Sequence, residues 1–331
     1  MSRVADRAAL TAPRLRLGTT PTPLEPAPRL SRAAGVEIWL KRDDLSGLGL
    51  GGNKVRALEY LLADATARGA DCLVTGAGPQ SNWAMLAALA ARRCGLDAFL
   101  VLYGDPSPRT GNLLLDHLAG ADVRFTGDPD RASVDAGIYA LAAELAAAGR
   151  RPYPLPRGGA TGLGALGYVR ASLELLGQLE DVGVGAASLW LPTGSCGTQA
   201  GLVAGTRWLC PGYEVVGVTV SRPVEECVDR ISRLAAEATA RLGLGGAPTR
   251  DGEDVRVLGG FAGPGYGRPS AQGEAAARLV ARSEGVLLDP VFGAKAMAAL
   301  LDAAASGRAA GPLVFLVTGG APTLFAGEAS L

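Results

Sequence analysis

The chain has 331 residues, enough for one large or two moderate domains with hydrophobic cores. Its 32 basic and 32 acidic residues balance, so the sequence gives no electrostatic reason to expect nucleic acid or an anionic membrane surface as a partner. No apolar run reaches about 18 residues, which argues against a transmembrane helix. The N-terminal segment lacks the apolar core of a signal peptide.

Strands and helices alternate along the first half of the chain. A Pro-rich segment leads to a strand near 36–44 and then to a glycine-rich loop. From Lys54 onward apolar residues recur at helical spacing, which predicts a helix that ends at Gly69. This alternation then continues and predicts a parallel sheet covered by helices. The strands are expected at 71–77, 98–104 and 122–127, and the helices at about 80–94, 112–120 and 132–149.

A Pro- and Gly-rich stretch at 151–167 interrupts this rhythm and is typical of a domain crossing. Beyond it the alternation resumes, with expected helices at 168–179, 198–210, about 223–243, 271–285 and 294–307. Strands are expected at 187–194, 213–220 and 311–320. The sequence therefore predicts two α/β units, the N-terminal segment belonging to the second.

Scarce residue types narrow the chemistry. His117 is the only histidine and ends a predicted helix with no nucleophile beside it, so a surface role is favoured over that of a general base. A Ser-His-Asp triad or a His-ligated metal site is therefore not expected. The five cysteines form no CxxC pair, which predicts reduced thiols in a cytoplasmic protein and no zinc framework. Lysine occurs only at positions 41, 54 and 295. In such an arginine-rich chain, the remaining lysines are candidates for imine chemistry, which needs a primary amine.

Three segments are candidates for binding and catalysis. At 191–205 a strand leads through a small-residue loop into a helix, an arrangement that suits a single phosphate; tight helix–sheet packing is the alternative. At 73–93 another strand meets a helix whose first turn carries Ser81, Asn82 and Trp83. That turn suits a substrate carboxylate, and ordinary capping is the alternative. At 47–60, Lys54 follows a glycine-rich loop and begins a helix, whose positive end should lower the lysine pKa.

Eight segments spread along the chain carry a recognisable pattern. They are TPTPLEPAPRLS, WLKRDDLSGLGLGGNKVRALEY, GPQSNWAMLAALAA, RGGATGLGALGYV, TGSCGTQAGL, GPGYGRPS, LLDPVFGAKAMAAL and TGGAPTLFA. Together they resemble the fold-type II pyridoxal-phosphate family that contains D-cysteine desulfhydrase and 1-aminocyclopropane-1-carboxylate deaminase. The resemblance covers nearly the whole chain, and GGNK and GALGY look nearer the desulfhydrase branch.

The resemblance implies two open, twisted, parallel-sheet α/β domains with the cofactor in the cleft between them, as in the β subunit of tryptophan synthase. The large domain would comprise residues 1–55 and 166–331, and the small inserted domain residues 56–165. A homodimer is also implied.

The same resemblance implies the roles of individual residues. Pyridoxal 5'-phosphate would be bound covalently to Lys54, with Ser81 and Tyr266 as the other catalytic residues and Lys54 as the base for the α-proton. Asn82 would bind the phenolic oxygen of the cofactor, and Thr318 would lie near its ring nitrogen. The implied cofactor-binding set is completed by Asn53, Thr193, Gly194, Ser195, Cys196, Gly197, Thr198 and Gly319, and the implied substrate-binding set is Ser81, Asn82, Trp83, Gly162, Tyr266 and Phe292.

Two departures from the family pattern bear on the substrate. Phe292 stands where the family usually has a tyrosine, and Trp83 stands where a His or Gln is common. The resemblance still implies a lyase that eliminates a β-substituent from a small amino acid, with D-cysteine as the first candidate and deamination of the cyclopropane acid ranked below it. A β/γ-replacement or cyclisation enzyme, and a cofactor-binding protein without turnover, remain open.

Overall fold

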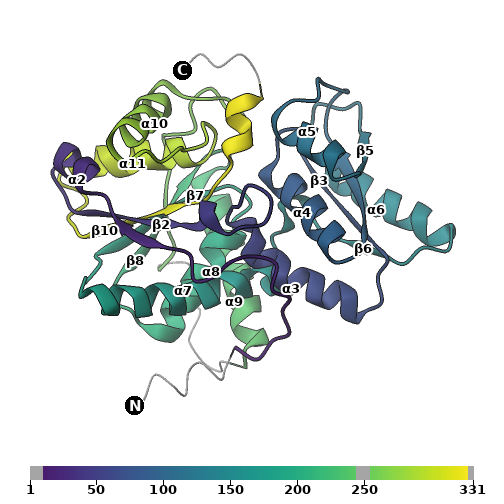
Figure 1. Ribbon diagram of the computed structural model, residues 1–331, viewed down its shortest axis with the longest axis horizontal. Coiled ribbons are helices and arrows are strands. Elements are labelled where there is room, and N and C mark those ends of the chain that lie inside the picture. Colours follow the sequence, from purple (N-terminus) through teal and green to yellow (C-terminus); the bar gives the residue numbers. More distant parts are fainter. Residues whose placement is uncertain (1–9, 244–253, 327–331) are drawn as a thin grey trace.

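The structure, a computed structural model, describes residues 10–243 and 254–326 and contains two β-sheets, each with helices on both faces (Figure 1). The large sheet is formed by both ends of the chain and the small one by the segment between them. Within the described residues, no helix is both long and apolar enough to cross a bilayer.

The large sheet has six strands. Only the edge strand β1 runs antiparallel to its neighbour; the other pairings are parallel. Side chains alternate along β10, so Val314 and Leu316 enter the core on one face while Phe315 and Val317 enter the other. The strand order is β1 (Leu24–Pro26), β2 (Ile38–Arg42), β10 (Leu313–Val317), β7 (Ser188–Thr193), β8 (Glu214–Thr219) and β9 (Arg256–Leu258).

Two groups of helices cover this sheet because both of its faces are apolar. One face packs against α7 (Gly162–Val182), α8 (Gly197–Leu209) and α9 (Val224–Arg241). The other packs against α2 (Pro28–Ala34), α10 (Ala271–Glu284) and α11 (Gly293–Ala305).

The small sheet has four parallel strands. Leu73 and Leu100 face α3 (Lys54–Ala67), α4 (Asn82–Arg93) and α5 (Gly111–Leu118). Val74 and Val101 face α6 (Ser133–Ala147) on the other side. The strand order is β5 (Asp122–Phe125), β4 (Asp97–Leu102), β3 (Cys72–Ala77) and β6 (Pro152–Pro154).

The predicted class, two α/β units with largely parallel sheets, is confirmed. The predicted start of α7 near residue 168 is wrong, because this helix begins at Gly162, where Thr161 accepts the N–H of Gly164 at 3.0 Å. Glycines lower helix propensity, but here they allow close packing. A Cβ on Gly167 would lie 2.3 Å from the carbonyl oxygen of Arg56 on α3.

Three short strands, three 3-10 turns and the helix α2, in a Pro-rich segment expected to be extended, were not anticipated. The strands are β1, β6 and β9, and the turns are η1 (Asp43–Leu45), η2 (Arg157–Gly159) and η3 (Ala321–Phe325). The domain limits at 55/56 and 165/166 fall inside α3 and α7 and stay a prediction, and residues 1–9, 244–253 and 327–331 lie outside the described part.

Candidate active site

A tightly turned glycine-rich loop places Lys54 at the start of α3. Gly51 has φ +71°, and a Cβ there would come within 1.9 Å of the carbonyl oxygen of Asp44. Ser46 binds both the N–H and the carbonyl of Gly52, at 2.9 and 3.1 Å. The N–H of Asn53 then donates to the carbonyl of Thr318 at 3.0 Å. These contacts fix the first residue of α3 against the end of β10.

The amine of Lys54 differs from those of the other two lysines. Lys41 donates to the Thr22 carbonyl, Glu174 and Gln178 at 2.5–2.6 Å. Lys295 donates to the carbonyls of Ala262 and Gly265. Lys54 has no hydrogen-bond or ion-pair partner among the described residues, and burial lowers its pKa to about 8. Near neutral pH an appreciable fraction of this amine is therefore unprotonated and nucleophilic.

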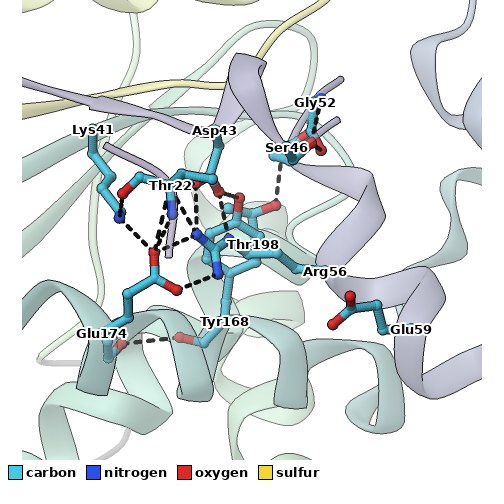
Figure 2. Close-up of polar contacts among 12 residues, drawn as sticks. Thr22, Lys41, Asp43, Ser46, Gly52, Arg56, Glu59, Tyr168, Glu174 and Thr198 are labelled. Carbon is cyan, nitrogen blue, oxygen red and sulfur yellow. Dashed lines mark hydrogen bonds and ion pairs between the residues drawn. The ribbon is translucent and has the colours of Figure 1, made fainter. Parts of the chain in front are cut away.

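A buried ionic cluster lies behind Lys54, between α3, β2 and α7 (Figure 2). Arg56 donates to both carboxylate oxygens of Asp43 at 2.8 Å and to both oxygens of Glu174 at 2.8 and 3.0 Å. The hydroxyl of Tyr168 also donates to Asp43. Arg56 and Asp43 are 3% and 0% exposed, so water cannot replace these contacts.

The loop between β7 and α8 forms an anion cradle. Cys196 has φ +74°, an unusual conformation for a residue other than glycine, and it turns the chain directly into the first turn of α8. The N–H groups of a first helical turn have no intrahelical partners. The carbonyls of Gly194 and Ser195 accept from Arg222 and Arg230, both at 3.2 Å. The backbone and the helix end together suit a phosphate.

The turn from β3 into α4 combines capping with an oriented amide. Ser81 accepts the N–H groups of Trp83 and Ala84 at 3.2 Å, so its hydroxyl caps the helix. The side-chain oxygen of Asn82 accepts from Asn112 at 2.7 Å. The amide nitrogen of Asn82 therefore points toward Gly320, and a Cβ added to Gly320 would lie 2.5 Å from this nitrogen. The indole of Trp83 donates to Thr75 at 2.9 Å.

These three segments line one cavity of about 830 Å³, measured with its open mouth. Ten of the expected site residues line it: Asn53, Lys54, Ser81, Asn82, Trp83, Gly194, Ser195, Tyr266, Phe292 and Thr318. Gly197 and Thr198 line a smaller adjoining cavity that shares Lys54 with the first. Sequence reasoning gave no role to Tyr103, Arg131, Arg157 and Arg222, which line the large cavity; Arg157 alone stands in a quoted segment, RGGATGLGALGYV.

Four expected site residues lie outside the lining of both cavities. Thr193 is buried and donates to Gln199 at 2.6 Å. Cys196 is 3% exposed, and its neighbour Cys227 and burial raise its thiol pKa, so it is not a nucleophile. Gly319 has φ +81° and packs on Gly52. The substrate-binding role expected for Gly162 has no support here, because its N–H donates to Glu237 of α9 at 3.2 Å.

Tyr266 and Phe292 close the side of the cavity formed by the large sheet. Their rings meet edge to face with centroids 6.1 Å apart, and the ring of Phe292 packs against Gly194. Burial, together with Tyr103, raises the pKa of Tyr266 to about 12. Its phenol therefore stays protonated at neutral pH and can donate a proton or hydrogen bond but is a poor base.

The residues present fit pyridoxal phosphate. A phosphate cradle, an unpaired primary amine and an oriented amide face one cavity, and the carbonyl of Thr318 already fixes the loop that carries the amine. In the described part of the chain, no group of three or more His, Cys, Asp or Glu residues is placed to hold a metal ion.

Comparison with known proteins supports this interpretation. A family model described as "Pyridoxal-phosphate dependent enzyme" matches residues 15–319. The D-cysteine desulfhydrases of Salmonella typhi and Salmonella newport are each 42% identical to the chain over 326 residues, covering 95% of it and 96% of each relative. A crystal structure of an ACC deaminase homologue is 38% identical, with a TM-score of 0.90, covering 96% of this chain and 95% of that one. The processed form of threonine deaminase isoform 2 from Solanum lycopersicum shares the fold; it is 19% identical with a TM-score of 0.68, covering 95% of this chain and 83% of that one.

Proposed function

The chain belongs to the family of pyridoxal-phosphate-dependent enzymes, and on that premise we propose that it eliminates the β-substituent of a small amino acid. The products would be pyruvate, ammonia and the released group, and D-cysteine would give sulfide. The observation that carries the proposal is the unpaired amine of Lys54, with its lowered pKa, between a phosphate cradle and the Ser81 turn. The bound cofactor supplies an electron-accepting ring that stabilises negative charge at the α-carbon.

Lys54 has two successive tasks in this proposal. Its unprotonated amine would hold the cofactor through the aldehyde. When released from the cofactor, the side-chain nitrogen of Lys54 would accept the α-proton of the substrate. A pKa of about 8 suits both tasks, because an ordinary lysine amine stays protonated near neutral pH.

The remaining residues would hold the two ligands. The loop from Gly194 to Thr198 binds the phosphate, Asn82 donates to the phenolic oxygen, and Thr318 faces the ring nitrogen. Ser81 and the N–H groups of its turn bind the substrate carboxylate. These assignments are supported by where the side chains lie around the cavity.

Tyr266 would act as the proton donor of the site. Its hydroxyl is protonated at neutral pH, and it is the aromatic hydroxyl facing Phe292, which has none. It is therefore placed to protonate a departing group or the released carbon.

Phe292 and Trp83 also support a second candidate, in which a nucleophile other than water captures the product of elimination in a replacement or cyclisation reaction. Deamination of 1-aminocyclopropane-1-carboxylate ranks lower, because opening the ring needs more assistance than expelling a thiolate. A cofactor-binding role without turnover would leave the lowered pKa of Lys54 unused.

Three further features belong to the same proposal. The enzyme would work in the cytoplasm, as a homodimer, with domains formed by residues 1–55 plus 166–331 and by residues 56–165. Analytical ultracentrifugation of the purified protein tests the dimer, because a single species of about 34 kDa would overturn it.

The deciding experiment is release of pyruvate and sulfide from D-cysteine, with L-cysteine measured in parallel, by protein loaded with pyridoxal phosphate. Turnover of D-cysteine supports the lyase. If the cofactor binds to Lys54 but neither enantiomer reacts, and a new amino acid appears when a second nucleophile is added, replacement chemistry takes its place.

A further inference from the structure

The first turn of α5 is fastened to the turn that carries Asn82. The side-chain nitrogen of Gln80 donates to the carbonyl of Thr110 at 3.0 Å, and its side-chain oxygen accepts the N–H of Asn112 at 2.9 Å. A backbone carbonyl can only accept and an N–H can only donate, so these contacts fix the direction of the Gln80 amide. The approach is close, because a Cβ on Gly111 would lie 2.4 Å from the same oxygen of Gln80. Asn112 is thereby held beside Asn82.

The backbone also dictates the direction of the Asn112 amide. Its nitrogen donates to the backbone carbonyl of Gln80 at 3.0 Å, and a carbonyl requires a donor, so the oxygen of Asn112 cannot take this place. The same nitrogen donates to the side-chain oxygen of Asn82 at 2.7 Å. The oxygen of Asn112 is buried and has no hydrogen-bond partner in the described part of the chain. The Asn112 amide therefore acts through its nitrogen.

This fixed direction decides which end of Asn82 enters the cavity. Asn82 lines the cavity, whereas Asn112 is completely buried behind it and lines neither of the two adjoining cavities. Because the oxygen of Asn82 is occupied by Asn112, its nitrogen is turned the other way, toward Gly320. An asparagine amide without such a contact can rotate by half a turn and present its oxygen instead, since its two ends are alike in size.

We propose that Asn112 is a positioning residue that makes Asn82 a hydrogen-bond donor to the phenolic oxygen of the cofactor. This inference rests on the proposed contact between Asn82 and that oxygen, and it deepens it by naming the group that sets its direction. A donor stabilises the ionised phenolic oxygen, the form in which the bound cofactor absorbs visible light. Without Asn112, the amide of Asn82 presents either end. The protonated oxygen, which absorbs in the near ultraviolet, then gains in population.

The test is the absorbance spectrum of the protein loaded with pyridoxal phosphate, at pH 7 and without substrate. Asn112→Leu removes the amide but keeps a side chain of similar size. It is expected to lower the ratio of visible to near-ultraviolet absorbance by at least about 10-fold, and Asn82→Ala should lower the ratio by a similar factor. A lowered ratio in Asn82→Ala with an unchanged ratio in Asn112→Leu would overturn the inference.

A double variant separates positioning from packing. When Asn112→Leu is added to Asn82→Ala, the ratio is expected to fall by less than about 2-fold more, because Asn112 then has no amide to direct. If the two losses multiply instead, with about 10-fold for each substitution, Asn112 acts independently of Asn82 and the inference is wrong.

Asp116 provides a matched control one turn further along α5. It is completely buried, as Asn112 is, and neither of its carboxylate oxygens has a hydrogen-bond partner in the described structure. Burial raises the pKa of Asp116 to about 8, so Asp116→Asn keeps both the size and the main charge state at pH 7. This variant should change the ratio by less than about 2-fold, because it removes no hydrogen bond to Asn82. A loss as large as that in Asn112→Leu would show that any disturbance of α5 alters the spectrum, and would overturn the inference.

Two further comparisons keep the outcomes distinct. Circular dichroism checks that Asn112→Leu folds, and if it does not, Asn112→Ala removes the same amide without adding bulk and takes its place. The spectral test does not depend on turnover, so a failure to release pyruvate counts against the proposed elimination and not against this inference. An unchanged spectrum in Asn82→Ala would instead defeat the proposed contact with the phenolic oxygen, and this inference with it.

Discussion

The first turn of α3 carries two cations, Arg56 and Lys54, in opposite electrostatic environments. On one side, Arg56 is enclosed by Asp43 and Glu174, and each of its charged contacts is matched (Figure 2). On the other side, only two residues earlier, Lys54 enters the cavity without a partner among the described residues. Arg56 is buried and Lys54 is half-buried, and the two cations differ in the groups that replace water around them.

This difference separates scaffold from reactivity. A buried cation held by carboxylates keeps its charge, and neighbouring Asp43 keeps a pKa of about 2, because Arg56 and Lys41 outweigh the effect of burial. A cation that is buried without such partners loses its proton more readily, as Lys54 does. The same helix turn thus combines a permanently charged anchor with a reactive amine.

Removing the reactive amine should have the largest effect. Lys54→Ala is expected to abolish the visible absorbance of covalently bound cofactor and to lower turnover by at least about a thousandfold, because it removes both the attachment point and the base. Absorbance spectra and borohydride trapping measure the first effect, and pyruvate release the second. Unchanged trapping in this variant would move the attachment to Lys41 or Lys295.

Removing the charged anchor, Arg56, should lower the stability of the fold. Arg56→Met leaves Asp43 and Glu174 buried without their main partner, and we expect the free energy of unfolding to fall by about 3–5 kcal/mol. Urea titration followed by circular dichroism measures it. Arg68→Met, at the C-terminal cap of the same helix, is the matched control. Arg68 is 70% exposed, pairs with Asp64 and lies 5.9 Å from the ring centroid of Tyr153, so its loss should change stability by less than about 1 kcal/mol.

The reactivity of Lys54 in cofactor-free protein should follow its lowered pKa. The rate of covalent capture of pyridoxal phosphate is expected to rise with pH and to level off above about 8, whereas an ordinary lysine with a pKa of 10.5 would show a rise that continues past 10. Stopped-flow absorbance between pH 6 and 10 decides this. A midpoint near 10 would show that the amine is not desolvated.

The charged anchor should make stability sensitive to acid. The pKa of Asp43 is depressed from 3.8 in the unfolded chain to about 2 in the folded protein. Its contribution, roughly 2 kcal/mol, is therefore complete above about pH 4 and is lost as the pH falls toward 2. The stability difference between wild type and Asp43→Asn should shrink by that amount between pH 5 and pH 2. A constant difference across this range would contradict the depressed pKa.

The sequence predicted the elements of the site that are local in the chain. Lys54, Asn82 and the loop around Gly194 each follow a strand or a glycine-rich turn, so their place at the end of a strand could be inferred. Arg131 and Arg157 were not found in this way. Arg131 stands in the loop between β5 and α6, Arg157 opens η2 after β6, and both reach the cavity only through tertiary packing.

The buried anchor was hidden from the sequence for a similar reason. Asp43 and Glu174 are 131 positions apart, and nothing near either one indicates that both enclose Arg56. The early start of α7 was missed because its glycines oppose helix formation in isolation. Close contact with α3 and α8 reverses that preference in the fold.

The path of the chain constrains how the cavity can change width. The backbone passes between the two sheets at two places, through α3 after β2 and through α7 before β7, and these two helices pack directly together at Gly167 (Figure 1). If one sheet rotates against the other, this helix pair is the natural pivot. Lys54, at the start of α3, lies next to the pivot and would be displaced little. Arg131, carried by the small sheet, would travel through a wider arc, so the same rotation would change its reach toward the mouth while the amine kept its place.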